Sequence, residues 1–516
     1  MSRIFTFLVC LFSFTALSAQ SEMIIEPTDV GILNQTIFGD TTATGERMDP
    51  ERVYVLRRGA PYLLSESMRW GGFHLRIKAE EGDGPRPLIL FNVDAGGSTL
   101  AQLFRLDDGA DFTISGLHIT CRDILGNSVN RAIRLSGDKG TVRVDDCIIE
   151  EAGQSGFRLN ADSVKLFVTN SIINRIGNPV NPNNGRFMDN RGHPIDSIWI
   201  ENCVVYNLTS RFYRPGSGAL LHNGIFNQNT VYNTGQQGMT LGEIDNVTIT
   251  NNIIANQVFL GYDTSGVQYQ VEIDTFDAAT DAITIENNNI YVEDQIVAAI
   301  PAVNSDGDSL MALTEDALFG PTLSEALSLT ASPTTNISEE LAFNDPPPVP
   351  TEFINANAVD TSGADDGIDN AGPWDFSDLA PDANYSLVGA QDIDRYTEYH
   401  DFSYPESAAS FTAGTAGQPL GADLSKLGTD VDEDYFITDN ILYYPNPVRE
   451  TLFIQNLDKA ELSSISIYNL AGQLLLQRKV EAINARFELG ELPSGTYVLT
   501  VLDRVGKVSS RKLIKR

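Results

Sequence analysis

The stretch that decides the fold is VTNSII (residues 168–173), because the same short pattern returns along the chain. Each copy has an apolar residue, a variable residue, an Asn-like residue and then small apolar residues. The copies are ISGLHI from Ile114, VDDCII from Val144, VTNSII from Val168, IENCVV from Ile200, FNQNTV from Phe226, ITNNII from Ile249 and IENNNI from Ile285. Successive copies start 30, 24, 32, 26, 23 and 36 residues apart, which indicates coils of a β-solenoid with loops of variable length.

The third position of each copy is expected to lie at a bend of the solenoid. Side chains alternate between the two faces of a strand, so the apolar first residue points inward and the third falls where the chain turns. Amides stacked about 4.8 Å apart can hydrogen-bond to one another, which predicts a structural ladder of side chains at this bend. Its members are Gly116, Asp146, Asn170, Asn202, Gln228, Asn251 and Asn287.

The repeats resemble those of the pectate-lyase-like right-handed parallel β-helix proteins, over roughly residues 50–295. This resemblance implies an all-β fold whose working body is a right-handed parallel β-helix (solenoid). A competing resemblance is weaker. DDCI (residues 145–148) is similar to one motif of the polygalacturonase-type glycosidases, whose paired carboxylates act as acid and base, but the NTD and GHG motifs of that family are missing.

The segments outside the repeats predict export and a capped solenoid. Residues 1–19 combine the basic Arg3, an apolar run and small residues before Ala19, the pattern of a secretory signal peptide. Residues 20–49 are expected to lead into the solenoid, and residues 296–440 to form an irregular cap and acidic linker. No later stretch approaches the roughly 20 apolar residues of a transmembrane segment.

Residues 441–516 carry four motifs in order: YPNPVRETLFI (444–454), SISIYNLAGQLLL (464–476), LPSGTYVLTVL (492–502) and KLIKR (512–516). Short alternating strands separated by Gly, Pro and Asn turns predict a small C-terminal β-sandwich. The motifs closely resemble the C-terminal sorting domain of type IX secretion in Bacteroidetes. The resemblance implies a partner, the type IX secretion machinery, and a protein that is secreted or held at the outer-membrane surface.

The charge of the chain narrows the classes of partner. A formal net charge of −34 disfavours nucleic acid, because phosphate binding requires clustered cations. No cofactor is firmly implied and no metal-binding residue is predicted; the cation to consider is Ca²⁺, since aspartates in the cap region offer oxygen ligands. They lack the spacing of a calcium-binding loop, so solvated acidic loops are the favoured interpretation. These aspartates are Asp306, Asp308, Asp360, Asp365, Asp366 and Asp369.

A second periodicity runs beside the first and carries arginine. Arg105, Arg134, Arg158, Arg191 and Arg214 precede successive copies of the repeat by 9, 10, 10, 9 and 12 residues. Apolar neighbours on both sides of the first three point their guanidinium groups outward. A column of like charges is destabilising unless it is neutralised, either by nearby acids or by an anionic ligand that guanidinium binds in a bidentate way. The candidate acids are Asp107, Asp138, Asp162 and Asp189.

The segment 175–214 is the predicted centre of the site, since its five arginines outnumber Asp189, Asp196 and Glu201 to give a charge of +2 in an acidic chain. Lyase chemistry on a uronic acid requires a cation beside the carboxylate and a base for the α-proton. The predicted catalytic residues are Arg191, Arg214, His193 and Tyr213. The predicted substrate-binding residues are Arg105, Arg134, Arg158, Arg186 and Arg211.

Two functions follow from these patterns. The first is an exported or cell-surface β-helix protein that engages an acidic polysaccharide, as a polysaccharide lyase if it is an enzyme. The alternative is a noncatalytic surface adhesin or structural solenoid. No complete catalytic motif separates them.

Overall fold

The computed structural model describes residues 21–515, with gaps. The gaps are residues 83, 93–98, 124–127, 178–182, 264–266, 305–306, 314–316, 331–334, 352, 356–399, 428–435, 439–440, 445–447, 449–450, 457–460, 470–471, 483, 505 and 507. The predicted signal peptide, residues 1–19, lies outside the described residues.

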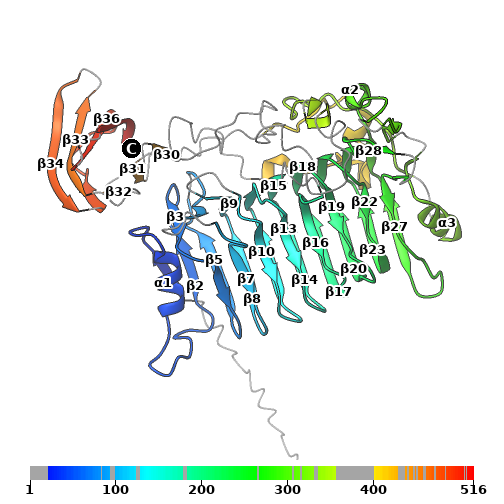
Figure 1. Ribbon diagram of the computed structural model, residues 1–516, viewed down its shortest axis with the longest axis horizontal. Coiled ribbons are helices and arrows are strands. Elements are labelled where there is room, and N and C mark those ends of the chain that lie inside the picture. The colour runs from blue at the N-terminus through cyan, green and yellow to red at the C-terminus, as the bar shows by residue number, and fades with distance from the viewer. Residues whose placement is uncertain are drawn as a thin grey trace, which may run out of the picture.

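Three parallel sheets wind into a right-handed parallel β-helix, the predicted fold. Each coil passes from a ten-stranded sheet through a nine-stranded sheet toward a six-stranded sheet, and the strands of successive coils lie side by side (Figure 1). Inward side chains of all three sheets form one apolar core that runs the length of the solenoid.

The ten-stranded sheet contains, in order, β1 (Glu22–Ile25), β2 (Val53–Leu56), β5 (His74–Ala79), β8 (Asp111–Ser115), β11 (Thr141–Asp145), β14 (Lys165–Thr169), β17 (Ile195–Glu201), β20 (Leu220–Asn227), β23 (Glu243–Thr250) and β27 (Ala282–Glu286). The nine-stranded sheet contains β3 (Pro61–Leu64), β6 (Leu88–Phe91), β9 (His118–Asp123), β12 (Ile148–Glu150), β15 (Ile172–Ile176), β18 (Val204–Leu208), β21 (Thr230–Thr234), β24 (Ile253–Gln257) and β28 (Asn289–Tyr291). The six-stranded sheet contains β4 (Met68–Trp70), β7 (Phe104–Leu106), β10 (Arg131–Leu135), β13 (Ser155–Leu159), β16 (Arg186–Asn190) and β19 (Arg211–Arg214).

The bend between the ten- and nine-stranded sheets lies where the sequence predicts it. All seven predicted bend residues adopt the left-handed backbone region, with φ between 47° and 70°. Gly, Asn and Asp tolerate this region better than other residues, which explains why they recur there. The recurring residue type therefore follows from the left-handed backbone that each coil adopts at this bend.

The buried amide ladder lies one residue later than predicted. Asn252 accepts hydrogen bonds from the backbone N–H of Asn229 (2.8 Å) and from its Nδ2 (3.0 Å), and Asn288 accepts the equivalent pair from Asn252 (both 2.9 Å). Asn336 continues the ladder by accepting from Asn288. At the predicted column, the side chains lie nearer to solvent, and the bond from Asn202 Nδ2 to Asn170 Oδ1 (2.9 Å) is one rung of the expected kind.

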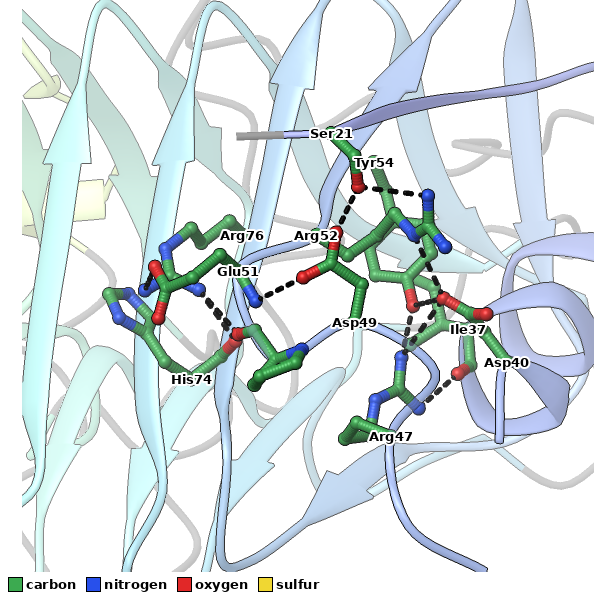
Figure 2. Close-up of polar contacts among 11 residues, drawn as sticks. Ser21, Ile37, Asp40, Arg47, Asp49, Glu51, Arg52, Tyr54, His74 and Arg76 are labelled. Atoms are coloured by element: carbon green, nitrogen blue, oxygen red, sulfur yellow. Dashed lines mark hydrogen bonds and ion pairs between the residues drawn. The ribbon is translucent and has the colours of Figure 1, made fainter. Parts of the chain in front are cut away.

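Both ends of the solenoid are covered by helices (Figure 1): α1 (Ile32–Gly39) beside β3, and α3 (Pro321–Thr330) beside β27. Figure 2 shows the polar contacts that hold the first turn. Asp40 accepts hydrogen bonds from the Tyr54 hydroxyl (2.9 Å) and from Arg52 Nε (3.2 Å), while Arg47 Nη1 donates to the Ile37 carbonyl (2.6 Å). Because β1 already pairs with β2, the solenoid begins within the stretch expected to lead into it.

The predicted cap region packs along the outer face of the nine-stranded sheet. Leu341, Phe343 and Phe402 form an apolar cluster with Tyr206 and Tyr232 of that sheet. The other elements after β21 are β22 (Met239–Thr240), β25 (Tyr262–Asp263), β26 (Val271–Glu272), α2 (Asp294–Ala299), β29 (Leu310–Met311) and the 3₁₀ turns η3 (Ala409–Phe411), η4 (Thr415–Gly417) and η5 (Leu424–Lys426). One face of the solenoid is thus closed by its own chain.

The C-terminal domain is the predicted small β-sandwich of two antiparallel sheets around its own core. One sheet contains β30 (Phe436–Thr438), β31 (Ile441–Tyr444), β32 (Thr451–Asn456) and β35 (Asn484–Glu488). The other contains β34 (Leu474–Ala482), β33 (Leu462–Asn469), β36 (Gly495–Asp503) and β37 (Val508–Lys515). None of the described residues forms a helix long and apolar enough to span a bilayer.

The amide ladder gives a test of what holds the coils in register. Asn252→Ala removes four buried hydrogen bonds and leaves partners of the ladder unsatisfied, so we expect the free energy of unfolding to fall by about 3 kcal/mol. Urea unfolding followed by circular dichroism measures this. The control Asn246→Ala changes an exposed amide and should stay within about 0.5 kcal/mol of the parent. Equal midpoints for the two variants would contradict a structural role for the ladder.

Candidate functional site: an arginine-rich sheet

The six-stranded sheet concentrates positive charge. Its strands carry eight arginines and one acidic residue, Asp189. The strand register aligns them in two columns. One contains Arg69, Arg105, Arg134, Arg158, Asp189 and Arg214; the other contains Arg131, Ser155, Arg186 and Arg211. The predicted arginine column therefore exists, with one exchange of residues.

Asp189, not Arg191, occupies the column on β16. The spacing to the next repeat suggested Arg191, but Arg158 pairs in register with Asp189, and Asp189 with Arg214. Arg191 lies two residues further on, just after the strand, and its guanidinium approaches the same carboxylate at 3.7 Å. The prediction of five arginines in register is wrong at this coil, although Arg191 remains part of the cluster.

Asp189 is the hub of the cluster. Its side chain is 0% exposed, and four guanidinium groups surround it. The N–O distances are 3.3 Å to Arg158, 3.5 Å to Arg214, 3.7 Å to Arg186 and 3.7 Å to Arg191. One carboxylate cannot neutralise four cations, so the column is only partly compensated here.

The other arginines of the sheet have fewer acidic partners. Arg69 and Arg105 share Asp107, the latter at 3.0 Å. Among the described residues, Arg131, Arg134 and Arg211 have no ion-pair partner within 4.0 Å. Within the described strands of the six-stranded sheet, four arginines have a buried Nε atom without a hydrogen-bond partner: Arg131, Arg134, Arg158 and Arg186. Buried donors of this kind are costly to leave unsatisfied, which adds to the free-energy cost of placing these arginines side by side.

The pKa values of two arginines also reflect the crowding of positive charge on this sheet. Burial and the neighbouring Arg158 and Arg134 lower the pKa of Arg131 to about 10. Burial, Arg186 and Arg214 lower the pKa of Arg211 to about 10, with Asp189 opposing the shift. The guanidinium groups stay charged at neutral pH, and their pKa values are lowered mainly by burial and further by repulsion between the cations. Bound anions would relieve it.

The predicted proton-transfer residues separate in the structure. Tyr213 lies in the core with 0% exposure; burial raises its pKa, and its hydroxyl accepts a hydrogen bond from Asn190 Nδ2 (3.1 Å). His193 lies in the turn after β16, 31% exposed, with Nδ1 2.7 Å from Asp162 Oδ1. Of the two, only His193 can reach a ligand at the surface.

Sequence reasoning missed Arg69 and Arg131. Arg69 stands in Met-Arg-Trp, the same apolar-Arg-apolar pattern that identified Arg105, so the signal was present. Arg131 opens β10 three residues before Arg134, and its pairing with Ser155 is set by the strand register alone. Of the candidate acids, Asp107 and Asp189 do pair with arginines, while Asp162 pairs with His193.

Arg175, counted in the positive segment, belongs to a different face. Its guanidinium pairs with the fully buried Glu150 of the nine-stranded sheet, which also contacts His118 Nε2 at 2.7 Å. Arg175 and the contact with His118 lower the pKa of Glu150 against the effect of burial. This network is buried and its charged groups are paired within the chain, so it is structural.

The described residues contain no group of three or more His, Cys, Asp or Glu side chains placed to hold a metal ion. Of the aspartates considered for Ca²⁺, Asp308 accepts a hydrogen bond from Asn304 Nδ2 (3.4 Å), and the others lie outside the described residues.

Asp189→Asn tests the hub. Removing the shared carboxylate leaves four arginines without their common partner, so the free energy of unfolding should fall by about 3 kcal/mol at low salt. Added sodium sulfate should restore part of the loss by screening and binding the cations. Thermal unfolding measures both effects, and Asp162→Asn, an exposed carboxylate, should change stability by less than about 1 kcal/mol. A hub variant as stable as the parent would show that the arginines do not need Asp189.

No curated protein matches the sequence. Among solved structures, the chain is similar to one titled "Structure of PL6 family alginate lyase AlyGC", at 12% identity and a TM-score of 0.28. The match covers 52% of this chain and 39% of that chain, so this protein spans well under half of that lyase.

The C-terminal match is of a different kind. Residues 442–516 match the family described as the secretion system C-terminal sorting domain. The match begins with β31 and includes the remaining strands of the sandwich, so sequence motifs and fold agree. The last 75 residues are therefore a type IX C-terminal sorting domain, and the protein is exported to the cell surface or beyond.

Proposed function

We propose that the exported β-helix binds an acidic polysaccharide along its six-stranded sheet. The observation that carries the proposal is the excess of guanidinium groups: eight arginines with one aspartate on six adjacent strands of a chain whose net charge is −34. Because the guanidinium groups within each column repel one another, a surface of this kind gains stability when an anion binds to it.

The arrangement favours an elongated polyanion. Adjacent strands are about 4.8 Å apart, so the columns present guanidinium groups at regular intervals along the solenoid. Guanidinium binds carboxylate or sulfate groups in a bidentate way, and a polyuronate or sulfated glycan offers such groups repeatedly. Nucleic acid is disfavoured because the rest of the surface is acidic and would repel a phosphate backbone.

A finer proposal is that the protein cleaves this glycan as a lyase. Asp162 can only accept a hydrogen bond when ionised, so its contact with His193 places the proton on Nδ1 and leaves Nε2 free to act as a base. Arg191 and Arg214, which share Asp189, would neutralise the substrate carboxylate. Activity on polyuronates should then produce ultraviolet-absorbing unsaturated products, and His193→Ala should lose them without losing binding. Binding with no such products would leave a noncatalytic adhesin.

The binding proposal is tested by replacing Arg134, Arg158 and Arg214 together with Gln. Charge-assisted hydrogen bonds contribute about 1.5 to 3 kcal/mol each, so affinity for polygalacturonate or alginate should fall by at least about a hundredfold after solvent screening. Calorimetry measures the affinity, and parent binding should weaken as salt rises. The control Lys78→Gln/Lys165→Gln/Lys426→Gln removes the same charge away from the six-stranded sheet and should bind within about threefold of the parent. If neither these polyuronates nor a sulfated glycan binds the parent, the arginines are only structural.

A further inference from the structure

The outer face of the ten-stranded sheet carries an aromatic column. Arg143, Phe167, Trp199 and Ile225 lie in register on β11, β14, β17 and β20. Trp199 is 38% exposed, which is unusual for so large an apolar side chain. No described helix lies over these strands (Figure 1). This column belongs neither to the core nor to the arginine-rich sheet.

The rings of this column are held in place by polar contacts. The Trp199 indole Nε1 donates to Glu201 Oε2 at 2.8 Å, and Glu201 Oε1 accepts from Asn227 Nδ2 at 2.8 Å. The Arg143 guanidinium lies 4.9 Å from the centre of the Phe167 ring. A fixed ring loses little conformational freedom when a ligand stacks on it, so the surface is organised before binding.

Hydrogen-bonding groups flank the aromatic column on both sides. Thr169, Glu201 and Asn227 follow one edge, and Lys165, Ser197 and Asn223 follow the other. The patch carries the cations Arg143 and Lys165 and the anions Asp145, Asp196 and Glu201, so its net charge is close to zero, in contrast to the arginine-rich sheet. A polyanion has no electrostatic reason to bind here, whereas a neutral ligand that is apolar on one face and rich in hydroxyls at its edges fits both features.

We propose that this aromatic column is a binding platform for a neutral polysaccharide. The C–H groups on the face of a pyranose ring are attracted to the negative face of an aromatic ring, and the ring hydroxyls can bond to the flanking amides and hydroxyls. Phe167 and Trp199 lie one strand apart, about 4.8 Å, which suits consecutive sugars of an extended chain. The protein would then hold two glycans, an acidic one and a neutral one, on different sheets.

A second copy of the chain is a poorer occupant. A stable protein interface buries about 800 Å² on each partner around an apolar centre. This patch offers one exposed indole, a half-buried phenyl ring and Ile225 among polar residues. A glycan needs far less apolar area, because each sugar contacts a single ring.

Affinity electrophoresis of the purified secreted protein tests the platform, with laminarin, xylan or mannan in the gel. At least one of these neutral glycans should retard the parent, and Trp199→Ala should weaken that binding by about tenfold or more. Trp199→Tyr should retain most of the binding, because it keeps a stacking ring. Arg134→Gln/Arg158→Gln on the other sheet should leave neutral-glycan binding unchanged, which separates this site from the acidic-glycan site.

Three outcomes would overturn the proposal. The parent could pass through all three gels without retardation, or Trp199→Ala could be retarded as strongly as the parent. In the third, the parent would be a dimer on size-exclusion chromatography and Trp199→Ala a monomer. That result would assign the column to self-association.

Discussion

Each coil of this β-helix sets its side chains directly above the equivalent side chains of the previous coil, about 4.8 Å away. This in-register stacking is the constraint on which the rest of the structure depends, because it turns a recurring residue into a column. For amides the consequence is favourable. Asn229, Asn252, Asn288 and Asn336 bond to one another through the core. For arginine the consequence is unfavourable, since stacking places like charges together, and only a counter-charge can keep such a column stable.

The three sheets of the solenoid differ in how their charged side chains are neutralised. The nine-stranded sheet buries its charges: Glu150 pairs with His118 and Arg175, and the chain's own cap region packs over the neighbouring strands. The six-stranded sheet supplies Asp189 as an internal counter-ion but keeps an excess of cations, which is the physical basis for an anionic ligand. The ten-stranded sheet is nearly neutral around Trp199, so a different class of ligand suits it. The sorting domain places all three surfaces outside the cell.

The sequence was sufficient for the fold and for the bend positions, because a left-handed backbone restricts the residue type locally, as at Asn170 and Asn251. It could not identify which amide turns inward. In Asn251-Asn252 and Asn287-Asn288 both neighbours are asparagine, and only the strand register distinguishes them. The same limit produced the error at Arg191, since the turn between β16 and β17 differs in length from the equivalent turn of the previous coil, and a distance to the next repeat does not fix a register. Burial of Tyr213 was equally invisible, because Phe212 and Tyr213 are both inside.

The central claim is that the arginine columns are completed by an anion from outside the chain. A crystal structure of the protein with a uronic acid hexasaccharide tests it most directly. We expect an extended oligosaccharide on the six-stranded sheet, with carboxylates within hydrogen-bonding distance of Arg131, Arg134 and Arg158. A ligand bound on another face, or an empty sheet in which these arginines turn to aspartates of their own chain, would contradict it.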